Sequence, residues 1–231
     1  GKMYSCSCAA GPALEGMNIT SGMRAAKGAV EDVHIGPEGI RLDVIGGDEP
    51  HGLCGSGILA VVRELVRNGL VTRRGAFAKP EDFEVGDYRR DILRYNGTKR
   101  EALLYSSGET ELLVTQSDVR QVQLAKGAIR SGIEVLLSHG GLTYEDIDKV
   151  LIAGQFGAHL PAESLLQIGL LPPVTEDKLA YAGNSAKSGA VAALLSDEVK
   201  KEMEDLAKHI QYIELGSSDN YERLFAKCLL F

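Results

Sequence analysis

The sequence contains no tryptophan, only 6% aromatic residues and four cysteines, and it has no long uninterrupted apolar stretch. A membrane-spanning helix needs roughly 20 consecutive apolar residues, so the sequence offers no candidate span, and it shows no signal-peptide pattern. Four cysteines in a chain this long do not make a disulfide framework, which favours a reducing, cytoplasmic setting. Basic residues are also fewer than acidic residues. The net charge of −7 argues against a general nucleic-acid binder, whose affinity comes from neutralising phosphates.

The remaining composition is that of an ordinary globular protein, with 44% hydrophobic residues, 25% charged residues and 27 glycines. A chain of 231 residues forms one large domain or two small ones. Residues 72–100 are locally basic, and we interpret them as a solvated face, with a partner contact as the alternative. The chain opens Gly1-Lys2-Met3 and enters motif-like sequence at once, so we expect it to be the middle of a larger polypeptide.

The most informative stretch is Asp148–Leu160, DKVLIAGQFGAHL. Its largely apolar residues 149–153 predict a short buried strand that runs into Gly154-Gln155-Phe156-Gly157. Glycines after a strand let a ligand approach the main chain closely, and ligands of open α/β sheets collect at the carboxyl ends of strands. A Gly-x-x-Gly turn is weak evidence alone. The alternative is a tight strand-to-helix turn that contacts no ligand.

Hydrophobic periodicity and turn signals predict the other elements. A hairpin is expected around residues 36–39, and an Asn96-Gly97 hairpin lies within an irregular region, 70–114, that reads as an inserted subdomain with a small antiparallel sheet. Thr115 and Asp118 have capping spacing for the longest helix, about Ser117–Ser138. Further expected elements are a helix opened by 52–57, a short helix at 161–167, a strand at 179–182, a small-faced helix after Gly183, a charged helix at 198–208, a strand at 210–215 and a C-terminal helix with core spacing.

Glycines inside the longest predicted helix also require an explanation. Gly127 and Gly132 each cost about 1 kcal/mol relative to alanine in a helix interior. Close approach of another helix or of a bound ligand would offset that cost.

Metal and nucleophile motifs are missing from the sequence. Cys6 and Cys8 form C-x-C, but Cys54 lies in a glycine turn and Cys228 on an apolar stripe, so small buried side chains are a better interpretation than an iron–sulfur cluster. The five histidines lack metal spacing, and no Walker A sequence or nucleophile elbow occurs. His159 could reach a ligand at the glycine loop, although a surface position is the simpler interpretation. We assign no metal ligand and no catalytic residue.

Five segments in order resemble the ATPase domain of the reductive activators of corrinoid-dependent proteins, a family of the actin, sugar-kinase and heat-shock ATPase (ASKHA) superfamily. They are CSCAAGPALEG, GLCGSGIL, TQSDVRQVQLAKGAIRSG, IAGQFG and GNSAKSGA, at residues 6–16, 52–59, 115–132, 152–157 and 183–190. The resemblance implies an α/β fold, an actin-like or ribonuclease H-like ATPase lobe with an inserted small α+β subdomain at about 70–114. Residues 1–231 would be the second lobe.

The resemblance also implies site residues. The glycine loop would be the adenosine motif, and the small-faced helix after Gly183 would pack at an interdomain hinge. Residues 55–57 could bind an anion at their helix N-terminus, although a glycine turn needed only for packing would look the same. The implied nucleotide-binding residues are Gly154, Gln155, Phe156, Gly157, Ala10, Gly11, Pro12, Glu15, Gly16, Gln123, Lys126 and Asn184, with Gly55, Ser56 and Gly57 as the anion turn.

The implied function is an ATP-dependent activator that helps restore the Co(I) state of a corrinoid protein. It would use ATP or ADP with Mg²⁺, and its partner would be a corrinoid protein or corrinoid methyltransferase system, with a homodimer as a further possibility. The family's Asp-Ile-Gly-Thr-type phosphate hairpin, its first lobe and its 2Fe–2S domain do not occur in this sequence. We therefore expect residues 1–231 alone to be a poor ATPase. The alternatives are a small-molecule kinase of the same superfamily and a non-catalytic nucleotide-sensing or docking module.

Overall fold

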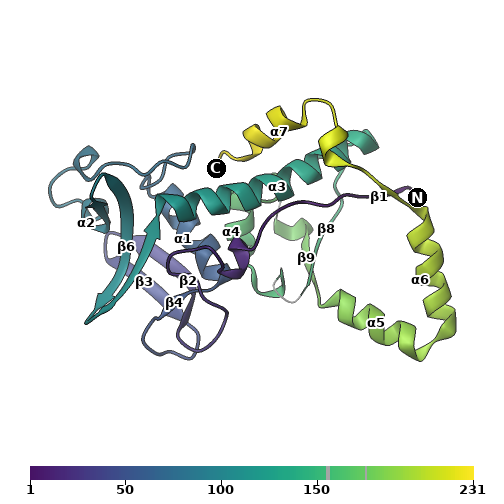
Figure 1. The fold of residues 1–231 in the computed structure, drawn as a ribbon, viewed down its shortest axis with the longest axis horizontal. Coiled ribbons are helices and arrows are strands. Elements are labelled where there is room, and N and C mark those ends of the chain that lie inside the picture. The colour runs from purple at the N-terminus through teal and green to yellow at the C-terminus, as the bar shows by residue number, and fades with distance from the viewer. Residues whose placement is uncertain (155–156, 175) are drawn as a thin grey trace.

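The computed structural model describes residues 1–154, 157–174 and 176–231 (Figure 1). Its helices lie along an elongated molecule with small sheets between them. The helices are α1 (Gly55–Arg67), α2 (Tyr88–Ile92), α3 (Gln116–Gly140), α4 (Ala162–Gln167), α5 (Ser185–Leu195), α6 (Asp197–His209) and α7 (Tyr221–Cys228). The strands are β1 (Met3–Ser5), β2 (Ala29–Gly36), β3 (Gly39–Val44), β4 (Gly52–Leu53), β5 (Leu93–Asn96), β6 (Lys99–Ser107), β7 (Thr110–Thr115), β8 (Val150–Ala153), β9 (Leu179–Gly183) and β10 (Ile210–Tyr212).

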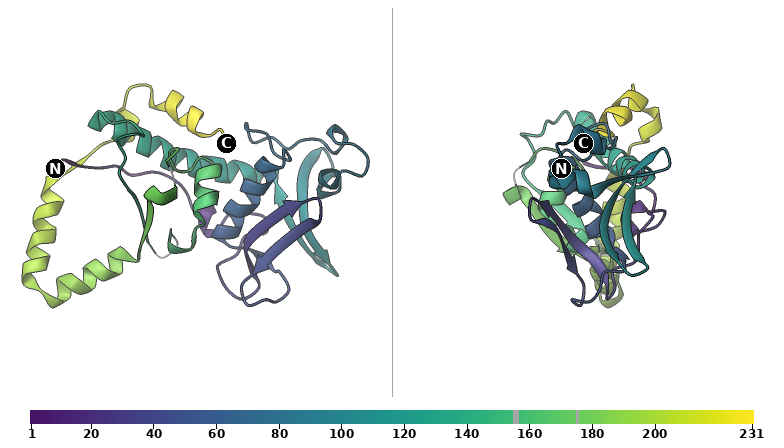
Figure 2. Two further views of the ribbon diagram at one scale, coloured as in Figure 1. Left: turned by 180° about the vertical axis from the view of Figure 1, so that it is seen from behind. Right: turned by 90° about the vertical axis from the view of Figure 1, so that its left-hand side faces the viewer.

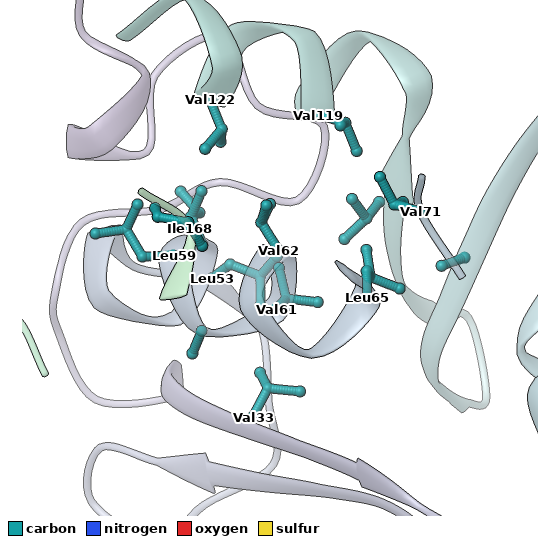
Figure 3. Close-up of a cluster of buried hydrophobic side chains, with 14 of the residues drawn as sticks. Val33, Leu53, Leu59, Val61, Val62, Leu65, Val71, Val119, Val122 and Ile168 are labelled. Carbon is teal, nitrogen blue, oxygen red and sulfur yellow. The ribbon is translucent and has the colours of Figure 1, made fainter. Parts of the chain in front are cut away.

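Helix α1 is the centre of the hydrophobic core, and every residue from Gly55 to Leu65 is buried. It lies between the sheet β3-β2-β4 on one side and α3 on the other (Figure 3). Val33 reaches α1 from β2, and Val119 and Val122 reach it from α3. Neighbours therefore cover α1 on all sides, and they enclose its charged residues Arg63 and Glu64 as well as its apolar ones.

The two predicted hairpins are confirmed. Strands β2 and β3 pair antiparallel and close at Gly36 and Gly39. Strands β5, β6 and β7 form an antiparallel sheet whose first turn is Gly97-Thr98, since Asn96 still pairs with Lys99. The buried side chains of this second sheet belong to the same core as α1, so the region 70–114 packs on the main body rather than around a core of its own.

The longest helix, α3, begins at the predicted capping box. The Thr115 hydroxyl accepts from the Asp118 amide, while the Asp118 carboxylate accepts from the Thr115 amide. Asp118 is buried and also accepts from the Thr20 amide at 2.9 Å, which ties the N-terminal loop to the start of α3. Helix α7 packs along α3, and Figure 1 shows the two lying side by side. A Cβ on Gly127 would lie 2.7 Å from Leu229 Cδ2, so the glycine explains the close approach of the C-terminal segment.

Two parallel strand pairs lie at the margin of the main core. Strand β1 pairs with β10, and β8 pairs with β9. The prediction of a buried strand at 149–153 is wrong for this chain, because Leu151 of β8 is 64% exposed and Tyr181 of β9 is 43% exposed. Val150, Ile152 and Leu179 on the other face of the pair are partly buried against the main core, so these strands are covered on one face only.

Helices α5 and α6 form an arm that extends away from the core, as Figure 2 shows from behind. Neither helix has a buried residue, although Leu194, Leu195 and Leu206 are among its apolar side chains. In the described part of the chain, no helix is both long enough and apolar enough to cross a lipid bilayer.

Candidate functional site

A cavity of about 600 Å³ opens at the N-terminal end of α1. Segments far apart in the sequence meet there: the N-terminal loop, β2, the start of α1 and the 3-10 turn Gly157–His159 that follows the glycine segment. The lining residues are Glu15, Arg24, Ala25, Glu31, Ile45, Cys54, Gly55, Ser56 and His159. The cavity therefore brings together three predicted site residues, Glu15, Gly55 and Ser56.

The start of α1 presents main-chain donors toward this cavity. Its N-cap residue, Cys54, makes no side-chain cap, and its thiol donates to the Val30 carbonyl instead. The first amides of a helix lack intrahelical partners and carry the positive end of the helix dipole, which favours an anion. Gly55 and Ser56 line the cavity, whereas Gly57 faces β2. The structure thus separates the predicted anion turn into two positions at the cavity and one at a packing contact.

The glycine segment lies at the carboxyl ends of β8 and β9. The Gly154 amide donates to the Gly183 carbonyl at 2.8 Å, so the two strand ends are joined directly. Both glycines have left-handed backbone, with φ of +104° and +60°, and a Cβ on either would meet no atom of the described residues within 4 Å. Together they form a ledge of main chain with open space beside it, which we call the Gly154/Gly183 ledge. Such a surface suits a flat ring laid against the backbone.

The structure describes only one of the other three residues of the predicted adenosine motif. Gln155 and Phe156 lie outside the described residues. Gly157 is buried, and a Cβ there would lie 2.8 Å from Ile152 Cγ2, so its immediate role is close packing against β8. The Asn184 side chain caps α5 by accepting from the Lys187 amide at 3.0 Å, directly beside the ledge.

Of the predicted residues in the N-terminal loop, Glu15 lines the cavity, whereas Ala10, Gly11, Pro12 and Gly16 are not among its lining residues. Gly11 has a φ of +66°, and Pro12 begins the 3-10 turn Ala13–Glu15 that delivers Glu15 to the cavity. The Ala10 amide donates to the Cys8 carbonyl at 2.9 Å. Gly16 ends the turn at φ +83°, where a Cβ would lie 2.6 Å from the Met23 carbonyl oxygen, so this position admits only glycine.

Gln123 and Lys126 lie away from this cavity, against the C-terminal segment. The Gln123 amide donates to the Leu229 carbonyl at 2.9 Å. The Lys126 ammonium donates to the carbonyls of Cys228, at 2.9 Å, and Leu230. Both side chains are buried, so in this structure they hold the chain end onto α3. A ligand contact by either would require that segment to move.

The position of Lys126 makes the stability of the protein depend on pH. Burial lowers the pKa of its ammonium group to about 8, with added repulsion from Arg130 and Arg73. The folded protein then binds fewer protons than the unfolded chain between about pH 8 and the ordinary lysine pKa of about 10.4, so stability rises with pH across that window. We expect urea unfolding between about pH 8 and 10 to show a more positive change of stability with pH in the wild type and in the exposed-lysine control Lys187→Met than in Lys126→Met. An equal change in all three proteins would contradict the assignment.

Metal binding finds no support in the described ranges, where no three His, Cys, Asp or Glu side chains gather into a possible metal site. Cys54 begins α1 and Cys228 ends α7, so the four thiols do not converge on a cluster. Sequence reasoning missed Arg24 and Glu31 as cavity residues, because neither lies in a recognisable motif. Sequence reasoning also favoured a surface position for His159, which lines the cavity. Its position two residues after Gly157 could have indicated this.

The fold defines an α/β domain with two candidate ligand surfaces, the Gly154/Gly183 ledge at the carboxyl ends of parallel strands and the cavity at the N-terminal end of α1. Residues 1–231 match the family described as the C-terminal domain of RACo, the ASKHA domain. The chain belongs to this family, and its fold is that of an ASKHA domain.

Named relatives agree with this assignment. The chain is 34% identical over 234 residues to the corrinoid activation enzyme RamQ of Eubacterium limosum, a match that covers 100% of the chain and 40% of RamQ. It is 25% identical over 250 residues to a Co(II) methylated amine-specific corrinoid protein reductase of Methanosarcina barkeri, covering 97% of the chain and 41% of that protein. A solved structure of a reductive activator for a corrinoid, iron–sulfur protein superposes with a TM-score of 0.87 at 32% identity, covering 99% of the chain and 36% of that structure. The chain thus spans about 40% of the length of these curated relatives.

Proposed function

We propose that this chain is the nucleotide-binding second lobe of an ATP-dependent reductive activator, which helps return the cobalt of a corrinoid protein to the Co(I) state. The observation that carries the proposal is the Gly154/Gly183 ledge, placed at the carboxyl ends of two parallel strands in a domain of this family. The named relatives are a corrinoid activation enzyme and a corrinoid protein reductase, which supports a corrinoid protein as the partner.

The residues present fit a nucleotide. The ledge offers open space beside side-chain-free backbone, as a purine ring or a ribose needs. The start of α1 supplies amides for an anion, and Arg24 adds a cation to the same cavity. Glu15 and Glu31 supply the carboxylates there, and Mg²⁺ at nucleotide sites is held by one or two carboxylates together with phosphate oxygens. When bound, Mg²⁺ would neutralise phosphate charge; the chain's own groups bind and orient the nucleotide.

The exposed arm supports the assignment of residues 1–231 as one lobe of a larger ATPase domain. Apolar side chains of α5, α6 and β8 lie on the surface, and the named relatives extend well beyond the matched region. A first lobe packed on these helices would cover them, and would bring its own phosphate hairpin to the cavity. The region of about 70–114 would then be an insertion on the side of α1 that lies away from the arm.

The mechanism we propose for this lobe is a two-state one. Nucleotide contacts at the ledge and at the start of α1 favour a closed arrangement of the two lobes, because a ligand shifts an equilibrium by its difference in affinity for the two states. Closure would reshape the surface that docks the corrinoid protein. A cytoplasmic location is part of the same proposal, and the four free cysteines of the chain support a reducing compartment.

Nucleotide binding tests the proposal directly. In the full-length protein, Gly154→Val places a branched side chain on the ledge at a φ of +104° and is expected to abolish ATP and ADP binding in isothermal titration. The matched control is Gly108→Val, which carries the same kind of backbone penalty at φ +56° in the remote β6–β7 turn and should bind normally. Thermal unfolding of both variants checks their folds.

Each result has a defined meaning. A wild-type protein that binds neither nucleotide would remove the proposal. Unchanged affinity in Gly154→Val would remove the ledge as the adenosine site. Phosphorylation of a sugar or an acid by the wild type would replace the activator with a small-molecule kinase.

A further inference from the structure

The C-x-C pair near the N-terminus is the chemical group that the proposed function does not use. The Sγ atoms of Cys6 and Cys8 lie 4.0 Å apart, close enough for one thiol to donate a hydrogen bond to the other. Both residues are half-buried, and Ser7 between them is exposed. Their segment follows β1 and leads into the loop that contains Ala10 and Gly11.

Helix α3 leaves room for both sulfur atoms. A Cβ on Gly132 would lie 2.5 Å from Cys8 Sγ and 3.2 Å from Cys6 Sγ. Gly132 is buried in the interior of α3, where glycine costs about 1 kcal/mol relative to alanine. The two sulfur atoms therefore occupy a niche that exists because position 132 has no side chain.

The surroundings favour a dithiol over a metal site. In the ranges the structure describes, the two thiols have no third His, Cys, Asp or Glu placed to complete a metal site. Burial, together with the neighbouring Cys6, raises the pKa of the Cys8 thiol to about 11. Cys8 is consequently a neutral thiol at neutral pH, as in a resting dithiol.

We propose that Cys6 and Cys8 form a redox-active dithiol that closes into an intrachain disulfide by exchange with a small disulfide. In the first step the thiolate of one cysteine attacks the small disulfide, and one small thiol leaves. In the second step the other cysteine attacks the cysteine sulfur of the mixed disulfide, and the second small thiol leaves. The small disulfide gains two electrons and the two cysteine protons, and the chain gains one S–S bond.

Closure has a structural consequence at the candidate site. A disulfide requires the sulfur atoms to approach to about 2.05 Å, so the Cys6–Cys8 segment must shorten on the α3 side. The Cys8 carbonyl accepts from the Ala10 amide at 2.9 Å, so the change is transmitted to the loop that carries Gly11 and Pro12. The dithiol itself does not depend on nucleotide binding, and its test is separate.

Peptide mapping tests the proposal in the full-length protein. Trypsin releases residues 3–24 as one peptide, because no Lys or Arg lies between Lys2 and Arg24, and Cys6 and Cys8 are its only cysteines. The reduced, folded protein is treated with oxidised glutathione, free thiols are alkylated, and the peptide is weighed. We expect a peptide lighter than the reduced form by two hydrogens and free of alkyl groups. Cys6→Ser and Cys8→Ser are expected to stop at the glutathione adduct.

Variants of α3 test whether the niche belongs to the site. Gly132→Ala puts a methyl group against both sulfur atoms and is expected to slow closure about tenfold, since exchange depends on access to the thiols. Gly127→Ala is the matched control, because its methyl group meets Leu229 and not the thiols. Recovery of a dialkylated peptide from the glutathione-treated wild type would overturn the proposal, and equal closure in both glycine variants would overturn the role of the niche. Should Gly132→Ala not fold, the wild type and the two serine variants still test whether Cys6 and Cys8 form a disulfide.

Discussion

Arg63→Met is expected to lower the free energy of unfolding by about 3–5 kcal/mol, because it removes the buried, hydrogen-bonded cation from the buried Glu64 carboxylate. The Arg63 side chain is 1% exposed, and so is that of Glu64, its partner at 3.1 Å. The guanidinium also donates to the Val33 carbonyl at 2.9 Å, to Asp32 at 3.1 Å and to the Ser164 hydroxyl at 2.9 Å. One side chain thus joins β2, α1 and α4. Urea unfolding followed by circular dichroism measures the loss.

The next turn of the same helix supplies a control. The Arg67 side chain is 56% exposed and lies 3.6 Å from the same Glu64 carboxylate, so Arg67→Met should cost at most about 1 kcal/mol. Equal unfolding midpoints for Arg63→Met and Arg67→Met would contradict a structural role for the buried network. Arg63→Met combined with Glu64→Met should recover part of the loss, because the second change removes the stranded charge.

This network shows what local sequence patterns could not supply. Arg63 and Ser164 are far apart in the chain, and neither belongs to a motif. Hairpins, capping boxes and amphipathic stripes are specified by residues within one or two turns of each other, which is why the β2–β3 hairpin and the Thr115–Asp118 cap were predicted and are confirmed. The pairing of β1 with β10 depends on the whole intervening chain and left no local signal.

The candidate site was predictable to a similar degree. Glu15, Gly55 and Ser56 were expected near a nucleotide, and the structure brings them to one cavity. The interval between Gln123 and Lys126 showed that both could share a helix face, but it could not show that the face meets the chain's C-terminal carbonyls. Periodicity also cannot show which neighbouring element covers a strand. The exposed face of β8 could therefore not be predicted from its sequence.

Gly57→Ala is expected to have the second large effect, and it links stability to the candidate site. A Cβ on Gly57 would lie 2.1 Å from the Val30 carbonyl oxygen. Because this oxygen belongs to the backbone of β2, the clash cannot be relieved by a side-chain rotation. The same carbonyl accepts from the Cys54 amide at 3.1 Å, so pushing α1 from β2 breaks the contact that sets the helix start.

We expect Gly57→Ala to cost about 3 kcal/mol or more in urea unfolding, at the upper end of overpacking effects, even though alanine is the better helix former. Gly36→Ala is the matched control, because a Cβ there meets nothing within 4 Å, and its effect should stay within about 0.5 kcal/mol. Since Gly55 and Ser56 move with the helix start, the folded fraction of Gly57→Ala should also bind ATP more weakly than Gly36→Ala does. Wild-type stability in Gly57→Ala would show that the contact between α1 and β2 is looser than the structure has it, and the amides at the start of α1 would then have no fixed position relative to the cavity.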